Sequence, residues 1–353
     1  MTTVAAIDTP AVLIDLPRVE ANLTRFQNYC DAHGLAARPH IKTHKLPDFA
    51  HRQVELGAAG ITCQKIGEAE VMVASGIRDV LLTYNILGAA KLARLKTLAE
   101  HCTLSVVADN EVVLQGLADA FAGGPPLTVL VECDSGGGRC GVQSSVDAVR
   151  LAQWIERADG LRFGGLMTYP PKRRIEAVRD WLAEAMHTFQ RAGIACQVVS
   201  SGGTPDIWRA HEVGAATEHR AGTYIYNDRM MVGAGAATWD DCALCVLTTV
   251  VSRPTEARAV LDAGSKALSS DLGGLTGHGY IREYPDAVIH MLSEEHAVVD
   301  LSACTGAKPA VGERVRVVPN HACVVTNLFN QVHGIADGQV ERVLTVEARG
   351  LMQ

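Results

Sequence analysis

Four side chains near the N-terminus form a basic row. The segment RPHIKTHK runs from Arg38 to Lys45, and Arg38, His40, Lys42 and His44 occupy alternate positions in it. In a strand these side chains share one face, and burying that face without a counter-charge is costly. We therefore expect a bound anion beside it. A lysine crowded by other cations has a lowered pKa, so more of its amine is neutral and can attack a carbonyl carbon.

Two other interpretations of this row stay open. The segment could be a solvated basic edge strand, or a plain phosphate-binding patch. Lys45 is the rival amine, but in a continuing strand it falls on the opposite face from Lys42. Lys42 is therefore the preferred nucleophile.

Two glycine-containing turns follow late strand-like runs. VVSSGGTPD, residues 198–206, opens a helical pattern, and backbone N–H groups at such a helix start can hold a phosphate. RAGTYIYND, residues 220–228, carries a second Gly-Thr pair. One such turn is usually only a turn, but two on consecutive late strands match the phosphate site of a barrel. The expected phosphate-site residues are Ser201, Gly202, Gly203, Thr204, Gly222 and Thr223.

A third glycine-rich loop, DSGGGRCGV, spans residues 134–142. Its glycines allow a ligand to approach the backbone, and Arg139 would direct a fixed cation at that ligand. The alternative is a flexible loop with a surface arginine. Tyr169 ends the next strand-like run, where it lies either beside a ligand or in the core.

A histidine and a cysteine two positions apart form the last chemical motif. In PNHACVVTNL, a strand would place His321 and Cys323 on one face. Imidazole and thiolate suit zinc, but two ligands are too few for a closed structural site. The pair fits a catalytic metal with positions left for water or substrate, and an ordinary buried pair is the alternative.

Alternating strands and helices would position these residues. Apolar runs from about residue 20 to 238 alternate with segments of helical spacing, which predicts a (β/α)8 TIM-type barrel with function at the C-terminal strand ends. A doubly wound open sheet is the competing topology. The expected strands are Ala37–Ile41, Gly60–Cys63, Asp79–Thr83, Leu104–Ala108, Leu127–Cys133, Phe163–Thr168, Gln197–Ser200 and Ala215–His219. The expected helices are Ile66–Ala74, Ala89–Glu100, Ser145–Ala158, Ile175–Ala192 and Pro205–Val213.

After about residue 239 the pattern changes to short β-branched runs separated by turn residues. This predicts a second, all-β domain of residues 239–353 that carries the His-x-Cys pair, joined by residues 1–19. The expected strands are Cys242–Ser252, Ala259–Ala263, Ala297–Leu301, Arg314–Val318 and Val340–Val346, with Ala11–Leu16 as an added strand.

Composition limits the function classes. A formal charge of −7 argues against a general nucleic-acid binder. We expect no membrane association, because no run of about 18 apolar residues occurs and the N-terminus lacks the pattern of a signal peptide. Ten scattered cysteines are typical of buried free thiols in a reducing compartment, so a cytoplasmic location is expected.

The motifs in order resemble a known family. DTPAVLIDLPRVEANL, then RPHIKTHK, then QKIGEAEVMVASG are similar to the D-threonine aldolase and D-serine dehydratase family, a branch of the alanine-racemase-like, fold-type III pyridoxal-phosphate (PLP) enzymes. The resemblance runs from Thr9 to about Val346. It implies that Lys42 carries PLP as a Schiff base, that Arg139 lies by the ring oxygen and that Tyr224 adjoins the phosphate. The PLP-site residues expected in all are Lys42, His40, Gln64, Arg139, Tyr169, Ser201, Gly202, Gly203, Thr204, Gly222, Thr223 and Tyr224.

The resemblance also implies a divalent metal on His321 and Cys323, zinc before manganese or magnesium, with His321 catalytic alongside Lys42. The Arg139 loop resembles the aldolases of the family, whereas Cys323 resembles its dehydratases. Family aldolases usually carry a histidine shortly after the tyrosine matching Tyr169, but here Pro170–Arg174 follow. The base could instead be Lys172, a metal-bound water or an unligated His321, or the basic residues could receive an anionic substrate side chain.

The expected activity is therefore PLP- and metal-dependent cleavage of a D-β-hydroxy-α-amino acid, as by D-threonine aldolase, to glycine and an aldehyde. A D-serine or 3-hydroxy-D-aspartate dehydratase is the alternative. Racemisation would need a second base that the sequence does not identify. A PLP carrier protein without turnover is a further alternative, but such proteins are usually a barrel alone, and the predicted β domain with its metal pair argues against it. A homodimer is expected by resemblance only.

Overall fold

The computed structural model describes residues 2–353, which divide into two compact units. The barrel unit comprises Arg25–Lys42, Pro47–Gly222 and Leu351–Gln353. The sheet unit comprises Thr43–Leu46, Thr223–Gly350 and the N-terminal residues up to Thr24. The sequence predicts a barrel domain of residues 20–238 and a β domain of residues 1–19 and 239–353. These domain limits stay predictions.

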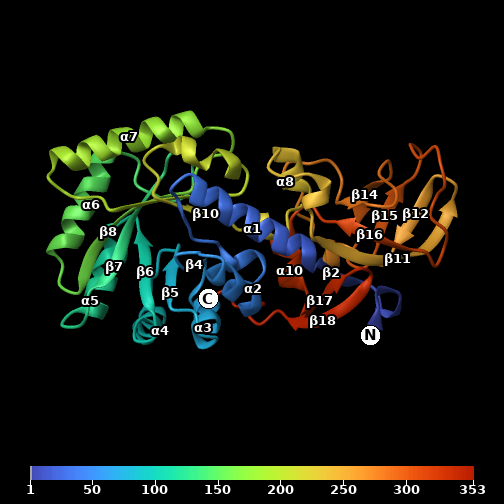
Figure 1. The fold of residues 1–353 in the computed structure, drawn as a ribbon, viewed down its shortest axis with the longest axis horizontal. Coiled ribbons are helices and arrows are strands. Elements are labelled where there is room, and N and C mark those ends of the chain that lie inside the picture. The colour runs from blue at the N-terminus through green and yellow to red at the C-terminus, as the bar shows by residue number, and fades with distance from the viewer. Residues whose placement is uncertain (1) are drawn as a thin grey trace. The chain divides into compact units, whose positions relative to one another are not determined.

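The barrel unit is built on eight parallel strands in the order β3-β10-β9-β8-β7-β6-β5-β4 (Figure 1). The strands are β3 (Ala36–Ala37), β4 (Ile61–Cys63), β5 (Asp79–Leu82), β6 (Thr103–Ala108), β7 (Leu127–Cys133), β8 (Leu161–Thr168), β9 (Val198–Gly202) and β10 (Glu218–Arg220). Its two edges meet, because Ala59 N–H donates to Ala37 O and Thr62 N–H donates to Pro39 O. A parallel bridge joins His40 to Thr62. The predicted (β/α)8 barrel is confirmed, and the open sheet is wrong.

Helices cover the outside of these strands. They are α2 (Pro47–Glu55), α3 (Ile66–Ala74), α4 (Ala89–Ala99), α5 (Glu111–Phe121), α6 (Ser145–Arg157), α7 (Ile175–Arg191) and the 3-10 helix η3 (Ile207–Val213), while α1 (Leu16–Ala32) runs from one unit into the other. Helix α7 buries Ile175, Val178, Leu182, Ala185 and Phe189 at helical spacing, which gives it one apolar face. Ser144 caps the start of α6, because its hydroxyl accepts from Asp147 N–H.

The barrel interior is apolar in its middle. Leu81, Val107, Leu130 and Met167 from four neighbouring strands form one buried cluster. Strand β8 approaches β9 so closely that a Cβ on Gly165 would lie 1.9 Å from Val198 O, so only glycine fits there. This packed core fixes the C-terminal strand ends, where the expected site residues lie.

The sheet unit is mostly sheet. Its strands are β1 (Thr2–Thr3), β2 (Ala11–Asp15), β11 (Leu244–Thr255), β12 (Arg258–Leu261), β13 (Tyr280–Ile281), β14 (Val288–Leu292), β15 (Ala297–Asp300), β16 (Arg314–Val318), β17 (Gln331–Ala336) and β18 (Gln339–Thr345). Strand β2 pairs with β11 and β17, which confirms the expected N-terminal strand. The unit is not purely β, because it also contains α8 (Arg229–Ala234), α9 (Ser265–Leu268), α10 (Ala322–Leu328) and the 3-10 helices η1 (Val4–Ala6), η4 (Thr223–Ile225) and η5 (Trp239–Asp241).

Three local predictions were wrong. The strand expected over Ala37–Ile41 ends early, and Ile41–Thr43 forms the 3-10 helix η2. Pro205–Val213 folds as the 3-10 helix η3 instead of an α-helix. His321 precedes α10 and Cys323 lies within it, so the pair is not on a strand.

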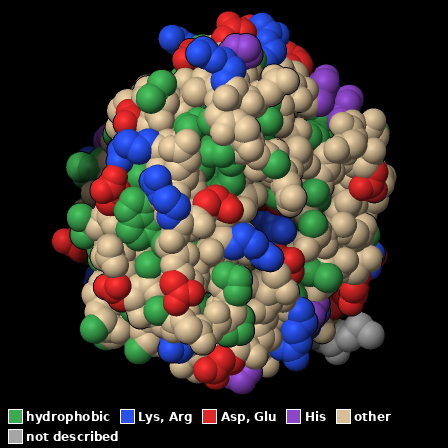
Figure 2. Space-filling view, turned by 90° about the vertical axis from the view of Figure 1, so that its left-hand side faces the viewer, with side chains coloured by type: hydrophobic (Ala, Val, Ile, Leu, Met, Phe, Trp, Pro, Cys, Tyr) green, Lys and Arg blue, Asp and Glu red, His purple; other side chains and the backbone are tan. Residues whose placement is uncertain are grey.

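The helical face of the barrel unit shows no large area of one charge. In Figure 2, Lys and Arg side chains lie among Asp and Glu side chains, and hydrophobic side chains are scattered between them. Within residues 2–353, no helix is both long enough and apolar enough to cross a bilayer.

Candidate functional site

Lys42 lies at the C-terminal end of the first barrel strand, in η2. Its backbone N–H contacts His40 Nδ1 at 3.4 Å, and His40 Nε2 lies 3.2 Å from Gln64 Oε1. The Gln64 amide donates in turn to Thr83 O at 2.8 Å. Since Nδ1 accepts, His40 carries its proton on Nε2. The chain of contacts brings Lys42, His40 and Gln64 together as expected and fixes the backbone that carries the Lys42 amine.

The other members of the basic row have different roles. Arg38 pairs with Glu218 at 2.8 Å and with Asp79 at 2.5 Å inside the barrel. Although burial alone would lower the pKa of Arg38, these two carboxylates raise it. The argument that the whole row needs a bound anion is therefore wrong for Arg38, whose charge is balanced by the protein.

Lys45 does not fit the role of the reactive amine. It is 4% exposed, its backbone has a φ of 57°, and its Nζ donates to Ala348 O at 3.2 Å. The expected geometry, with Lys45 on the opposite face of a strand, is wrong because the chain turns at η2. Because the Lys45 side chain is buried and hydrogen-bonded, Lys42 is still the preferred reactive amine.

The end of β9 and the turn after it contain buried hydroxyls that suit a phosphate. Ser201 Oγ and Thr204 Oγ1 are buried and have no hydrogen-bond partner in residues 2–353. The N–H of Gly203 already donates to Arg220 O, so this amide, expected at the phosphate, is not one of the available donors. A buried donor without a partner costs free energy. A phosphate group bound here would supply acceptors, so the turn fits the PLP phosphate.

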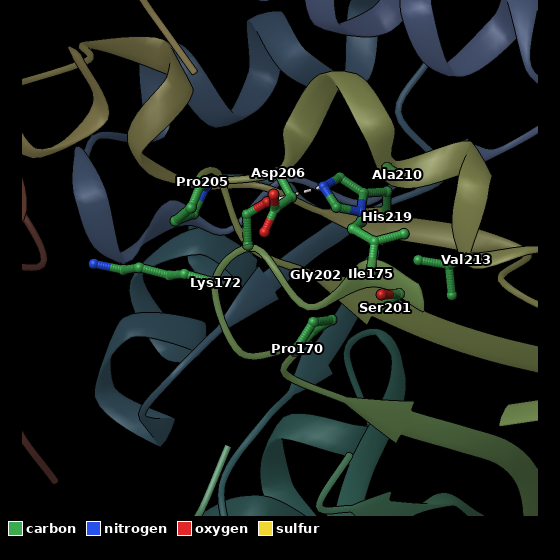
Figure 3. A pocket seen from close by; sticks show the side chains of 11 residues that line it. Pro170, Lys172, Ile175, Ser201, Gly202, Pro205, Asp206, Ala210, Val213 and His219 are labelled. Atoms are coloured by element: carbon green, nitrogen blue, oxygen red, sulfur yellow. Dashed lines mark hydrogen bonds between the residues drawn. The ribbon is translucent and has the colours of Figure 1, made fainter. Parts of the chain in front are cut away.

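His219, in β10, hydrogen-bonds the backbone of this turn. Its Nε2 lies 3.1 Å from Gly203 O (Figure 3). Burial, and then the neighbouring Arg220 cation, lower the pKa of His219 to about 4. The ring is therefore neutral at pH 7 and donates to Gly203 O. Figure 3 also shows Lys172 extending away from His219 and Ser201.

Arg139 and Tyr169 lie together at the ends of β7 and β8. The guanidinium carbon of Arg139 is 4.9 Å from the centroid of the Tyr169 ring. Both side chains line a hollow of which Asp134 and Lys172 also form part. A Cβ placed on Gly203 would lie 3.5 Å from Cε2 of Tyr169, so Tyr169 also adjoins the turn after β9. The structure thus brings Arg139, Tyr169 and Gly203 together.

The amides of the three glycines before Arg139 are hydrogen-bonded within their own loop. The N–H groups of Gly136, Gly137 and Gly138 all donate to the carboxylate of Asp134, at 2.6 to 3.1 Å. Burial acts to raise the pKa of Asp134, but these hydrogen bonds outweigh it and lower the pKa. The loop is therefore shaped by its own aspartate, and the ligand-binding role of Arg139 stays a prediction.

Sequence reasoning missed two buried charges near Arg139. Glu132 lies 3.9 Å from Arg139, and burial raises the pKa of Glu132 to about 7 although Arg139 opposes the shift. Arg220 hydrogen-bonds Ser200 and donates to Thr168 O at 2.9 Å, and Ser200 in turn bonds Glu218. The sequence signal that could have indicated this network is the placement of polar residues in two strands, Ser200 in β9 and Glu218 and Arg220 at alternate positions of β10.

His321 and Cys323 are brought together at the start of α10 in the sheet unit. The two side chains hydrogen-bond each other, and His321 Nδ1 lies 2.8 Å from Asp271 Oδ2. Burial would lower the pKa of His321, but the contact with Cys323 and then Asp271 raise it to about 10. An imidazole nitrogen and a thiolate that converge are suitable ligands for a borderline-soft divalent metal.

The backbone of this pair is held from α8. Asp228 Oδ1 accepts from Met231 N–H and caps α8, while Asp228 Oδ2 accepts from Ala322 N–H at 2.9 Å. Among residues 2–353, no group of three or more His, Cys, Asp or Glu side chains stands in position to share a metal. The pair therefore fits an open site with two protein ligands.

The residues directly after β10 belong to two different units of the chain. Gly222 ends the barrel unit, whereas Thr223 and Tyr224 begin the next segment of the sheet unit. Thr223 Oγ1 lies 3.7 Å from Cys323 Sγ, and Tyr224 is buried. Thr223, expected at the phosphate, thus contacts the His-x-Cys pair.

Two family models match this chain. The alanine racemase N-terminal domain matches residues 14–230, and the putative serine dehydratase domain matches residues 243–335. A D-threonine aldolase from Arthrobacter sp. is 36% identical over 98% of this chain and 94% of its own length. A D-threo-3-hydroxyaspartate dehydratase from Delftia sp. (strain HT23) is 32% identical over 96% of this chain and 97% of its own.

Solved structures agree with these matches. The D-threonine aldolase from Filomicrobium marinum superposes with a TM-score of 0.92 at 33% identity, covering 100% of this chain and 98% of that one. A cysteine variant of D-threo-3-hydroxyaspartate dehydratase in a metal-free form has a TM-score of 0.85 at 31% identity, covering 98% and 99%. The chain therefore belongs to the D-threonine aldolase and D-serine dehydratase family of alanine-racemase-like, fold-type III PLP enzymes.

Proposed function

We propose that this chain is a PLP- and metal-dependent lyase that cleaves D-β-hydroxy-α-amino acids between Cα and Cβ, as a D-threonine aldolase does. The products would be glycine and an aldehyde. The 36% sequence identity to a D-threonine aldolase, which extends over 98% of this chain, supports the reaction class.

The convergence of His321 and Cys323 carries this proposal. Their side chains hydrogen-bond each other, so an imidazole nitrogen and a thiol sulfur are already placed side by side. A divalent metal, when bound, supplies a Lewis acid that polarises an oxygen such as the β-hydroxyl. A racemase or a carrier protein has no use for such a group, so the pair favours a lyase.

The barrel residues would bind and orient the cofactor. PLP, when bound, supplies an electron-withdrawing ring that accepts charge from Cα. Lys42 would hold its aldehyde carbon, and the hydroxyls of Ser201 and Thr204 would donate to its phosphate. Arg139, packed on the Tyr169 ring, would direct a cation at the ring oxygen. His40 and Gln64 would keep the Lys42 backbone in place.

A dehydratase that acts on D-serine or 3-hydroxy-D-aspartate is the second candidate. Cys323 favours it, because the resemblance associates a cysteine at this position with the dehydratases. A thiolate also selects zinc over harder metals such as magnesium. The dehydratase would remove a Cα proton with Lys42 and release a keto acid and ammonia.

The base for the β-hydroxyl distinguishes the two reactions. A base close to the β-oxygen would lead to cleavage of Cα–Cβ, whereas Lys42 acting at Cα would lead to loss of the hydroxyl. Lys172 is exposed, lines the same hollow as Arg139 and Tyr169, and in Figure 3 extends away from the Ser201 hydroxyl. Lys172 and a group at the His321–Cys323 pair are therefore the two candidates for this base.

A product assay separates the candidates. Protein loaded with PLP would be given D-threonine, D-serine and 3-hydroxy-D-aspartate, with and without added Zn²⁺, Mn²⁺ or Mg²⁺. Glycine with an aldehyde supports the aldolase, and a keto acid with ammonia supports the dehydratase. Racemised amino acid alone, or no product at all, would contradict the lyase. The expected homodimer and cytoplasmic location remain proposals alongside it.

A further inference from the structure

We propose that Asp271 is a positioning residue for the metal pair, which orients the His321 ring and fixes its tautomer. This inference rests on the proposed metal role of His321 and Cys323 and adds a residue outside that pair. Asp271 is fifty positions from His321 in the chain, yet its Oδ2 lies 2.8 Å from His321 Nδ1.

The carboxylate of Asp271 has two separate hydrogen bonds. Its Oδ1 accepts from Gly273 N–H at 3.2 Å, which closes a short turn in its own loop. The contact with His321 is made by the other oxygen, Oδ2. Because a carboxylate only accepts, Nδ1 must carry the imidazole proton. Nε2 is then the ring nitrogen directed away from Asp271, and it would bind the metal in place of its own proton.

The loop that carries Asp271 is anchored to the segment that carries His321. Asn320 is 2% exposed, and its amide donates to Asp271 O at 3.2 Å and to Gly277 O at 2.8 Å. Arg229 donates to both Asn320 Oδ1 and Gly277 O. The backbone N–H of Asp271 donates to Ser269 Oγ at 3.1 Å. These bonds define where the carboxylate stands relative to the His321 ring.

A metal-bound histidine commonly donates its second ring N–H to such a carboxylate, and losing that partner typically weakens metal binding by about 10- to 100-fold. Neither residue is deeply buried, since the His321 side chain is 29% exposed and that of Asp271 is 40% exposed. The contact is therefore not needed to fill the core, which separates a positioning role from a purely structural one.

The test compares zinc affinity in the full-length protein, its Asp271→Asn variant and its Asp271→Ala variant, by competition with a chromophoric chelator. In Asp271→Asn the amide oxygen can keep the turn with Gly273, but its NH2 would then face His321 and favour a proton on Nε2. We expect about 10- to 100-fold weaker zinc binding in both variants, with melting temperatures close to that of the parent protein. Asp240→Ala, which removes an exposed carboxylate elsewhere in the sheet unit, should bind zinc normally.

Cobalt substitution supplies an independent readout. The thiolate-to-cobalt charge-transfer band should persist in Asp271→Asn at saturating metal, because Cys323 is unchanged, while the titration midpoint moves to higher cobalt. Zinc affinity in Asp271→Asn equal to that of the parent would overturn the role of Asp271 alone. Zinc binding that His321→Ala and Cys323→Ala leave unchanged would instead overturn the metal pair itself.

Discussion

Thr43 Oγ1 lies 3.1 Å from Cys323 Sγ, although 280 positions of sequence separate the two residues. Thr43 is fully buried and directly follows Lys42 in the chain. A hydroxyl in this position can donate to a thiolate and hold it in one orientation. The residue that directly follows the proposed Schiff-base lysine therefore contacts the proposed metal ligand.

Replacing Thr43 should weaken the metal site. Thr43→Val removes the hydroxyl but keeps the shape, so the thiolate loses a hydrogen bond worth about 0.5–1.5 kcal/mol. We expect roughly 2- to 10-fold weaker zinc binding by chelator competition. Thr43→Ser retains the hydroxyl and should behave like the parent protein. Equal affinities in the valine and serine variants would refute this role.

The second ligand should decide metal preference. Cys323→Asp replaces a soft sulfur with a hard oxygen, so zinc affinity should fall relative to that for Mn²⁺ or Mg²⁺. Metal content after equilibration with equal concentrations of the three ions, measured by mass spectrometry, would reveal the shift. An unchanged preference for zinc would mean that Cys323 does not bind the metal.

The hydroxyls at the turn after β9 should recognise phosphate. Ser201→Ala and Thr204→Val each remove one buried donor, and a hydrogen bond to a charged group is worth about 1.5–3 kcal/mol. PLP affinity should therefore fall by about 10-fold or more in each variant. Pyridoxal, which lacks the phosphate, should bind all three proteins alike. A matching loss for pyridoxal would assign these residues a general structural role instead.

The contribution of His219 to stability should be lost in mild acid. Burial lowers its folded-state pKa to about 4 from an ordinary value of 6.5, so the unfolded chain takes up the proton first. This contribution to the free energy of unfolding is therefore fully retained above about pH 6.5 and declines as the pH falls toward 4, by about 3 kcal/mol at most. Because burial raises the pKa of Glu132 to about 7, that carboxyl acts in the opposite direction, so the contribution of His219 is the difference between the parent and a His219 variant in urea unfolding at pH 7.5 and 5.0.

His219→Gln removes the titrating ring, so going from pH 7.5 to 5.0 should cost it less stability than it costs the parent. His187→Gln, at an exposed position of α7, serves as the matched control and should keep the pH dependence of the parent. An identical pH dependence in His219→Gln and the parent would mean that His219 makes no such contribution.

The barrel could be predicted because its parallel strands are buried on both faces. Such strands appear in the sequence as continuous apolar runs, and Leu127–Cys133 was predicted at its observed bounds. Helices with one apolar face, such as Ile66–Ala74, were predicted equally well. Periodicity did not distinguish the barrel from an open sheet, because closure depends on hydrogen bonds of Ala37 and Pro39 with the next strand.

The local geometry of the site was harder to predict. The alternating charges after Arg38 imitate a strand, but the chain turns into a 3-10 helix at Ile41. The β-branched residues after Cys323 favour a strand, yet Ala322–Leu328 form a helix, tied at its first residue by the Asp228 carboxylate. Asp271 has no local signal at all, because its partner is distant in sequence.

Borohydride reduction of the PLP-loaded protein, followed by peptide mass spectrometry, tests the central claim most directly. The yellow imine absorbance near 420 nm should disappear on reduction, and the pyridoxyl adduct should map to Lys42. Lys42→Ala should give neither colour nor adduct, whereas His321→Ala should keep both while losing lyase activity. A colourless parent protein, or an adduct on Lys45 instead, would contradict the account.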